Sequence, residues 1–124
     1  MANRKNKEVE DFYISKTEKA YIAGFIDGEG SILLVKNNDR GLQPRICIYN
    51  SHKETLDWMA GKINAKNRLY DRRRDKLHHK DGYVISLSAT EHCKLLLEKI
   101  FPYLKIKSDN ASMVLSYIYS KEMN

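Results

Sequence analysis

The 124-residue sequence contains only two cysteines and no long apolar run, and each absence narrows the class of protein. Cys47 and Cys93 belong to no C-x-x-C motif or Cys/His cluster, so we do not expect a zinc site. Both lie in apolar patterns and are expected to be buried free thiols in a reducing compartment. No segment has the pattern of a signal peptide, and none approaches the roughly 20 apolar residues of a membrane span. We therefore expect an intracellular protein that is not secreted.

Acidic residues are fewer than basic ones, 16 against 22, which gives a formal net charge of +6. A basic domain of this size favours a polyanionic partner, either a nucleic acid or an anionic membrane surface. Net charge alone does not show whether the basic residues bind such a partner or only keep the protein soluble. The positions of the charges in the fold have to distinguish these two explanations. Apolar residues make up 42% of the chain, enough for a core. We expect one domain at residues 16–124 after an N-terminal extension at residues 1–15.

Three S-x-x-E patterns indicate helix starts, because the two side chains of such a capping box satisfy backbone N–H groups of the first turn. The pairs are Ser15 with Glu18, Ser51 with Glu54, and Ser88 with Glu91. A further helix is expected to begin near Ser108. Apolar stripes at helical spacing identify the expected core positions. These are Leu56, Met59 and Ile63, then Cys93, Leu96, Leu97 and Ile100, and finally Ala111, Val114, Leu115 and Ile118.

Two pairs of strand-like segments lie between these helices, each pair separated by polar or turn-forming residues. The order α-β-β-α-β-β-α, followed by a terminal helix, predicts an α+β domain. Its sheet is antiparallel and open on one face, while helices cover the other face. The strand segments are residues 31–38, 43–50, 67–74 and 83–88.

Alternation along the strands predicts which side chains the open face presents. In the second strand, Pro44, Ile46 and Ile48 point toward the helices, so the intervening polar residues point away. Polar, basic and aromatic side chains at two-residue spacing can reach base edges in a DNA major groove, which admits a β-ribbon. An ordinary solvated face is the alternative. The expected DNA contacts are Asn37, Gln43, Arg45, Tyr49, Arg68, Tyr70, Arg72, Arg74 and Lys76, although Leu33 and Val35 share the outward parity of Asn37.

The first helix has one face with almost no side chains, because Ala20, Gly24 and Gly28 repeat at i, i+4. Each helical glycine costs roughly 1 kcal/mol relative to alanine, so such a face suggests close approach of another backbone. The chain contains one such helix, and its natural partner is the same helix of a second copy. We therefore predict a two-fold homodimer with Ala20, Gly24, Asp27 and Gly28 at the interface.

The same helix ends in Asp27-Gly28-Glu29-Gly30, which places carboxylates beside glycines. Oxygen ligands in small number suit magnesium, which keeps several waters and accepts phosphate oxygens. A two-fold axis between paired helices would bring Glu29 and its mate together at one phosphodiester-cleaving centre. A simple turn after a helix is the alternative explanation of this motif.

The string Ile22-Ala23-Gly24-Phe25-Ile26-Asp27-Gly28-Glu29-Gly30 closely resembles the nine-residue motif that names the LAGLIDADG homing endonucleases. The order of elements is also similar to that family's, and residues 101–115 resemble its stretch with a catalytic lysine. The resemblance implies a saddle-like DNA-binding sheet. Since the motif occurs once, it also implies the intron-encoded, homodimeric branch, which cleaves near-palindromic double-stranded DNA with Mg²⁺.

Carried over residue by residue, the resemblance assigns Glu29 to the acidic metal-binding position and Gly28 to a carbonyl metal ligand. Lys107 matches the basic residue near the scissile phosphate. His52 matches a polar position that orders water, and a residue just inside a helix start is the alternative explanation. Some members have a basic residue where Leu56 stands, and this chain departs from them because Leu56 is expected in the core.

Two other readings of the sequence stay open beside a DNA endonuclease. One is an RNA maturase that assists intron splicing, and the other is a DNA-binding regulator that does not cleave. A membrane-surface protein is disfavoured, since no amphipathic basic helix is present. The expected location is the compartment that holds the target DNA, either a prokaryotic cytoplasm or an organelle matrix.

Overall fold

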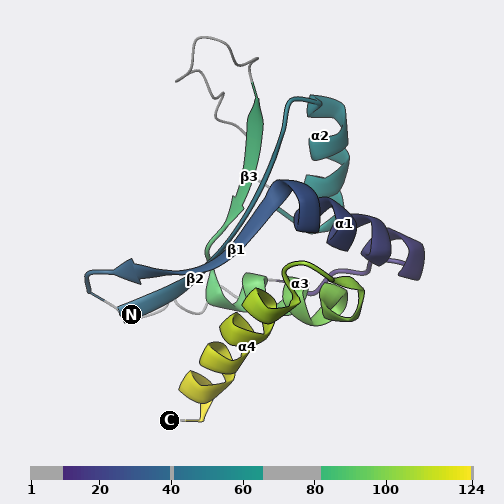
Figure 1. Ribbon diagram of the computed structural model, residues 1–124. Coiled ribbons are helices and arrows are strands. Elements are labelled where there is room, and N and C mark those ends of the chain that lie inside the picture. Colours follow the sequence, from purple (N-terminus) through teal and green to yellow (C-terminus); the bar gives the residue numbers. More distant parts are fainter. Residues whose placement is uncertain (1–9, 40, 66–81, 124) are drawn as a thin grey trace.

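A three-stranded antiparallel sheet carries four α-helices on one side in residues 10–39, 41–65 and 82–123, the part of the chain that the computed structural model describes (Figure 1). The expected α+β class is therefore confirmed, and the expected strand at 67–74 lies outside the described residues. The strands are β1 (Gly30–Asn37), β2 (Gly41–Asn50) and β3 (Tyr83–Leu87), in the order β1-β2-β3. The helices are α1 (Lys16–Glu29), α2 (Lys53–Lys62), α3 (Thr90–Ile100) and α4 (Ser108–Glu122), with a short 3-10 helix η2 (Phe101–Tyr103) before α4.

The register of the sheet confirms the predicted alternation. Ile32 pairs with Ile46, and Ile48 pairs with Ile85, so that each row of the inner face is built from branched aliphatic side chains. All four are at most 1% exposed. The β1–β2 hairpin closes at Gly41, whose φ of 81° lies in the left-handed region that glycine adopts without strain.

The helices cover this inner face with the apolar stripes expected from the sequence. The positions expected in α2, α3 and α4 are all buried, as are Ile22, Ala23 and Ile26 of α1. Burial of this kind is the main source of stability, at roughly 25 cal/mol per Å² of apolar surface. Both cysteines are buried free thiols, as predicted.

Only the first of the three predicted capping boxes is correct. Ser15 and Glu18 exchange the two expected hydrogen bonds, with N–O distances of 3.2 and 3.0 Å. At α2 the N-cap is His52 rather than Ser51, because the Asn50 side chain accepts the His52 N–H at 2.8 Å and turns the chain one residue later. At α3 the N-cap is Ala89 without a side-chain bond. The backbone carbonyl of Ser88 instead accepts from Gln43 of β2, which keeps Ser88 with the strand.

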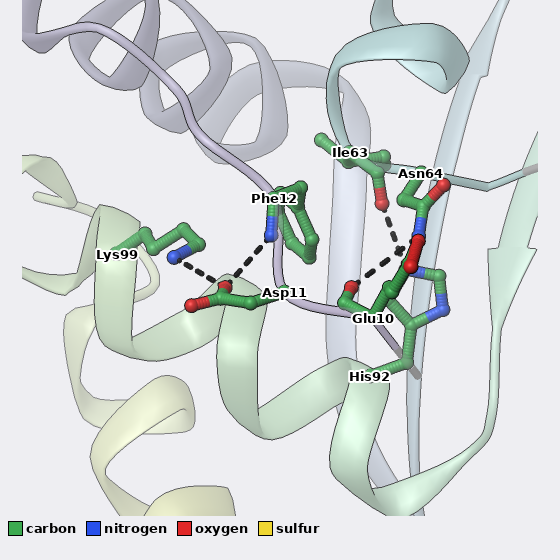
Figure 2. Close-up of polar contacts among 7 residues, drawn as sticks. All are labelled: Glu10, Asp11, Phe12, Ile63, Asn64, His92 and Lys99. Carbon is green, nitrogen blue, oxygen red and sulfur yellow. Dashed lines mark hydrogen bonds and ion pairs between the residues drawn. The ribbon is translucent and has the colours of Figure 1, made fainter. Parts of the chain in front are cut away.

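The residues just before α1 pack against α3 and the end of α2 (Figure 2). Asp11 forms an ion pair with Lys99 of α3 at 2.9 Å, and the Phe12 ring meets His92 edge-on with centroids 5.9 Å apart. His92 in turn contacts the Ile63 carbonyl through Nε2 at 2.7 Å, which joins α3 to the end of α2. Asn64 donates its side-chain amide to the Glu10 carbonyl at 3.4 Å. These contacts join the segment before α1 to α3 and to the end of α2.

Candidate active site and nucleic-acid interface

The end of α1 is fixed where the helix passes directly into β1. Glu29 is the last helical residue and is exposed, while Gly30 caps the helix and begins the strand. A Cβ atom on Gly30 would lie 2.7 Å from the Cys47 carbonyl oxygen of β2, a separation that real Cβ atoms essentially never show. Gly30 therefore allows the helix end and the neighbouring strand to approach closely, and this approach sets the position of Glu29.

Lys107, predicted as the basic residue near the scissile phosphate, lies at the same end of α1. It is the N-cap of α4, and its Nζ donates to the backbone carbonyl of Asp27 at 2.7 Å. A cation at the C-terminal end of a helix also interacts favourably with the helix dipole. The structure thus holds the ammonium group against the last turn of α1, two residues from Glu29.

Asp27 is buried within its own chain, whereas the sequence predicted it at the dimer interface. Its side chain is 8% exposed and faces its own chain, so it does not belong to the exposed face that carries Ala20, Gly24 and Gly28. The two carboxylate oxygens accept the backbone N–H groups of Lys105 at 2.7 Å and Lys107 at 2.9 Å. Burial alone would raise the pKa of Asp27, but the backbone donors of Lys105, Lys107 and Ile106 and the charge of Lys107 outweigh burial and lower this pKa. The carboxylate is therefore held ionised in the interior.

The sequence did not predict that Asp27 binds the loop before α4, although its position on α1 gave one indication that it is buried. Asp27 follows Ala23 by four residues and so shares the buried face of α1. A carboxylate on a buried face requires partners. Its partners come from a loop about 80 positions later, which no local pattern identifies.

His52 lies at the other end of the helical layer. Its Nδ1 accepts the Thr55 N–H at 3.3 Å and contacts Thr55 Oγ1 at 2.7 Å, as an N-cap does. It lines a surface hollow of about 480 Å³ together with Thr17 and Tyr21 of the first turns of α1, whereas Glu29 is at the last turn. Among the described contacts of His52, none reaches Glu29 or Lys107, and its local role is to cap α2.

The open face of the sheet carries the described DNA-contact candidates. Arg45 is exposed and pairs across the strands with Leu33, which is 41% exposed. Asn37 donates its side-chain amide to Gln43 Oε1 at 2.8 Å, and Gln43 donates onward to the Ser88 carbonyl at 3.3 Å. These bonds fix the orientation of the Gln43 amide. Tyr49 is half-buried on the same face. Five further candidates, Arg68, Tyr70, Arg72, Arg74 and Lys76, lie outside the described residues.

The small-residue face of α1 is open. Ala20, Gly24 and Gly28 are exposed, and nothing lies within 4 Å of a Cβ built on either glycine. No contact within the described part of the chain therefore accounts for these glycines. Beside this face, Tyr21 is 50% exposed and Trp58 is 40% exposed, and their rings meet edge-on at 5.6 Å. The combination is typical of a surface that another macromolecule covers.

The donors at the α1 terminus fit magnesium better than zinc. Within the described residues of one chain, no three His, Cys, Asp or Glu side chains cluster closely enough to hold a metal ion. Glu29 instead offers one exposed carboxylate at a helix end, where the last backbone carbonyls lack helical partners. Few ligands, all of them oxygens, are compatible with a magnesium ion that keeps waters and binds phosphate.

No family model and no curated protein matches the sequence. Solved structures do resemble the fold. The homing endonuclease I-CvuI, in complex with the I-CreI target and magnesium with the DNA not cleaved, is 20% identical with a TM-score of 0.66, over 84% of this chain and 67% of that one. The archaeal intron-encoded homing endonuclease I-Vdi141I, in complex with DNA, is 18% identical with a TM-score of 0.67, over 87% of this chain and 70% of that one.

A third similar structure is the LAGLIDADG meganuclease I-AabMI bound to uncleaved DNA, at 14% identity and a TM-score of 0.63. The match covers 86% of this chain and 38% of that one, so this chain spans about two thirds of I-CvuI but well under half of I-AabMI. Among the described elements, no helix is long and apolar enough to cross a membrane. The chain has the fold of the LAGLIDADG homing endonucleases.

Proposed function

We propose that this chain is a LAGLIDADG homing endonuclease that cuts both strands of a near-palindromic DNA site as a homodimer. One observation carries the proposal: an exposed carboxylate, Glu29, ends a helix whose last turn also holds the Lys107 ammonium group. The DNA complexes of the similar structures support a duplex DNA substrate. Such an enzyme acts in the compartment that holds its target DNA, a prokaryotic cytoplasm or an organelle matrix.

The open sheet face is the proposed DNA-binding surface. Arg45 is free to extend into a groove, and an arginine can bind a guanine edge with two hydrogen bonds. The Gln43 amide is pre-oriented by Asn37 and Ser88, so it loses little conformational freedom on contact with a base. The proposed surface also includes Arg68, Tyr70, Arg72, Arg74 and Lys76, which lie outside the described residues.

A second copy completes the proposed site. Each chain contributes one Glu29, and the open face of Ala20, Gly24 and Gly28 runs along the helix that ends in it. Pairing of the two faces would bring the two helix ends together, and a two-fold symmetric enzyme suits a near-palindromic site. Glu29 of each copy, with the Gly28 carbonyl, would hold Mg²⁺.

The chemistry is hydrolysis of a phosphodiester, in which water attacks phosphorus in line and the P–O bond to the leaving oxygen breaks. Bound Mg²⁺ would supply Lewis-acid polarisation of the phosphate and a lower pKa for bound water. The chain supplies the rest. Lys107 offsets the negative charge that develops on the phosphate. The sheet face holds the duplex, and the Glu29 carboxylates would hold the metal ion close to the two-fold axis.

The proposal is tested by incubating the chain with a randomised duplex DNA library and sequencing the ends that form. We expect double-strand cuts at one near-palindromic site with Mg²⁺, and none when the metal is chelated. Selective DNA binding without cutting would instead identify a regulator. Binding of intron RNA in preference to duplex DNA would identify a maturase. Cutting without dependence on the divalent ion would refute the magnesium assignment.

A further inference from the structure

The described residues include one buried acidic side chain, Asp27, and the chemistry proposed above does not use it. Its two oxygens accept the N–H groups of residues 105 and 107, 2.7 and 2.9 Å away. Both donors belong to the loop between η2 and α4, which forms no regular helix or strand there. The carboxylate therefore takes the place of the backbone partners that the loop lacks.

The loop returns a hydrogen bond to the same residue. Lys107 Nζ donates to the Asp27 carbonyl at 2.7 Å, so residue 27 contacts Lys107 through both its side chain and its backbone. Neighbouring loop residues give less support, because Ile106 is 72% exposed, although Leu104 is buried. The position of the Lys107 ammonium group therefore depends on the path of the loop, and the Asp27 carboxylate fixes that path.

We infer that Asp27 is a positioning residue, which sets the Lys107 ammonium group beside Glu29 for DNA cleavage. The inference rests on the proposed function. A carboxylate suits this task because each of its oxygens accepts one of the two N–H groups, whereas an amide has one accepting oxygen and one donating nitrogen. The alternative is that Asp27 only ties α4 to α1 and has no influence on the reaction.

The variant Asp27→Asn separates these two roles, because it retains the shape of the side chain but loses one of the two bonds. We expect single-turnover cleavage on saturating DNA to slow by roughly tenfold to a hundredfold, as for a misplaced catalytic group, with DNA affinity unchanged. The matched control is Asp109→Asn, which removes the same charge from an exposed position in the first turn of α4. The control is expected to cleave at the wild-type rate.

The cleavage rate of a double variant distinguishes a positioning role of Asp27 from a purely structural one. If Asp27 acts through Lys107, Asp27→Asn with Lys107→Met cleaves no more slowly than Lys107→Met alone. Rate losses that multiply would show two independent contributions and overturn the inference. A wild-type rate for folded Asp27→Asn would overturn it as well, while leaving the proposed function intact. Absence of any cleavage by the wild-type chain would overturn both.

A second pair of variants tests the same bond from the loop side, should Asp27→Asn fail to fold. Lys105→Pro removes the N–H donor, and the preceding residue Leu104 has φ −78° and ψ 144°, which is compatible with a following proline. Lys105→Gln removes the same charge but retains the donor. We expect Lys105→Pro to cleave roughly tenfold more slowly than Lys105→Gln. Equal rates for the two folded variants would contradict the inference.

Discussion

The two ends of α1 are held by different kinds of contact. At its start, Ser15 and Glu18 cap the helix within a span of four residues, and Glu18 also pairs with Lys62 of α2 at 2.9 Å. At its end, Asp27 binds a loop about 80 residues later, and Gly30 lies against the backbone of β2. The cap at the start is local and the start is partly exposed, with one ion pair to α2, whereas the end is assembled from distant segments and partly buried.

The contacts at the start of α1 stabilise the helix, whereas those at its end position the residues proposed to take part in the reaction. A local cap contributes about 1 kcal/mol and mainly stabilises the helix that it begins. The distant contacts at the other end fix several segments relative to one another, which a catalytic centre requires. We therefore expect changes at the start of α1 to alter stability, and changes at its end to alter assembly and cleavage.

The largest effect is expected at the small-residue face of α1, formed by Ala20, Gly24 and Gly28, which lies between the two ends of the helix. Gly24→Leu places a bulky side chain where we propose that two helix backbones touch, so the homodimer is expected to dissociate. Sedimentation at several protein concentrations measures the loss. Gly61→Ala is a suitable control, because Gly61 is also open to solvent in a helix but lies on α2. A Gly24→Leu chain that remains dimeric would place the interface elsewhere.

The next effect concerns the charge at the end of α1. Lys107→Met retains much of the aliphatic stem but removes the ammonium group, which should matter most in the transition state. We expect roughly a hundredfold slower single-turnover cleavage on saturating DNA, as for loss of an electrostatic contact to the reacting group. The salt dependence of binding should change by about one phosphate contact at most. A wild-type rate with weaker binding would make Lys107 a DNA-positioning residue.

Gly30→Ala tests the close approach at the helix end. The added methyl group would meet the Cys47 carbonyl at 2.7 Å, so the helix or the strand has to shift. Overpacking of this kind costs about 1–3 kcal/mol, which thermal or urea unfolding measures. Gly24→Ala, at an open helical position, is expected to raise the stability of the isolated chain by roughly 1 kcal/mol instead. Equal stabilities for the two variants would argue against a tight contact at Gly30.

The smallest effect is expected at His52. His52→Ala removes the cap of α2 and should lower the free energy of unfolding by about 1 kcal/mol. If capping is its main role, the cleavage rate per folded dimer stays near the wild-type value. A large loss of rate with little loss of stability would restore the water-ordering role that the family resemblance implied.

The same contrast explains how much the sequence could predict. Periodicity located the apolar stripes of α2, α3 and α4, and alternation located the inner face of β2, because both depend on neighbours within a few residues. Two capping boxes failed: at α2 the Asn50 side chain accepts the His52 N–H and moves the helix start by one residue, and at α3 the Ser88 carbonyl accepts from the distant Gln43 and keeps Ser88 with the strand. The bond between Asp27 and residues 105 and 107 had no local signature. Lys107 was found only through a family resemblance, and the spacing of the sequence gave no other indication of it.

The most direct test of the account is the cleavage activity of Glu29→Gln on the DNA target of the wild-type dimer. The substitution retains the size of the side chain and removes the charge that we propose holds Mg²⁺ at the exposed end of α1. Single-turnover cleavage and DNA affinity are measured on the same preparation, with circular dichroism as a check of folding. The account predicts that the variant binds DNA at least as tightly as the wild type and does not cut it. Cleavage at the wild-type rate would contradict the assignment of Glu29 to the active site.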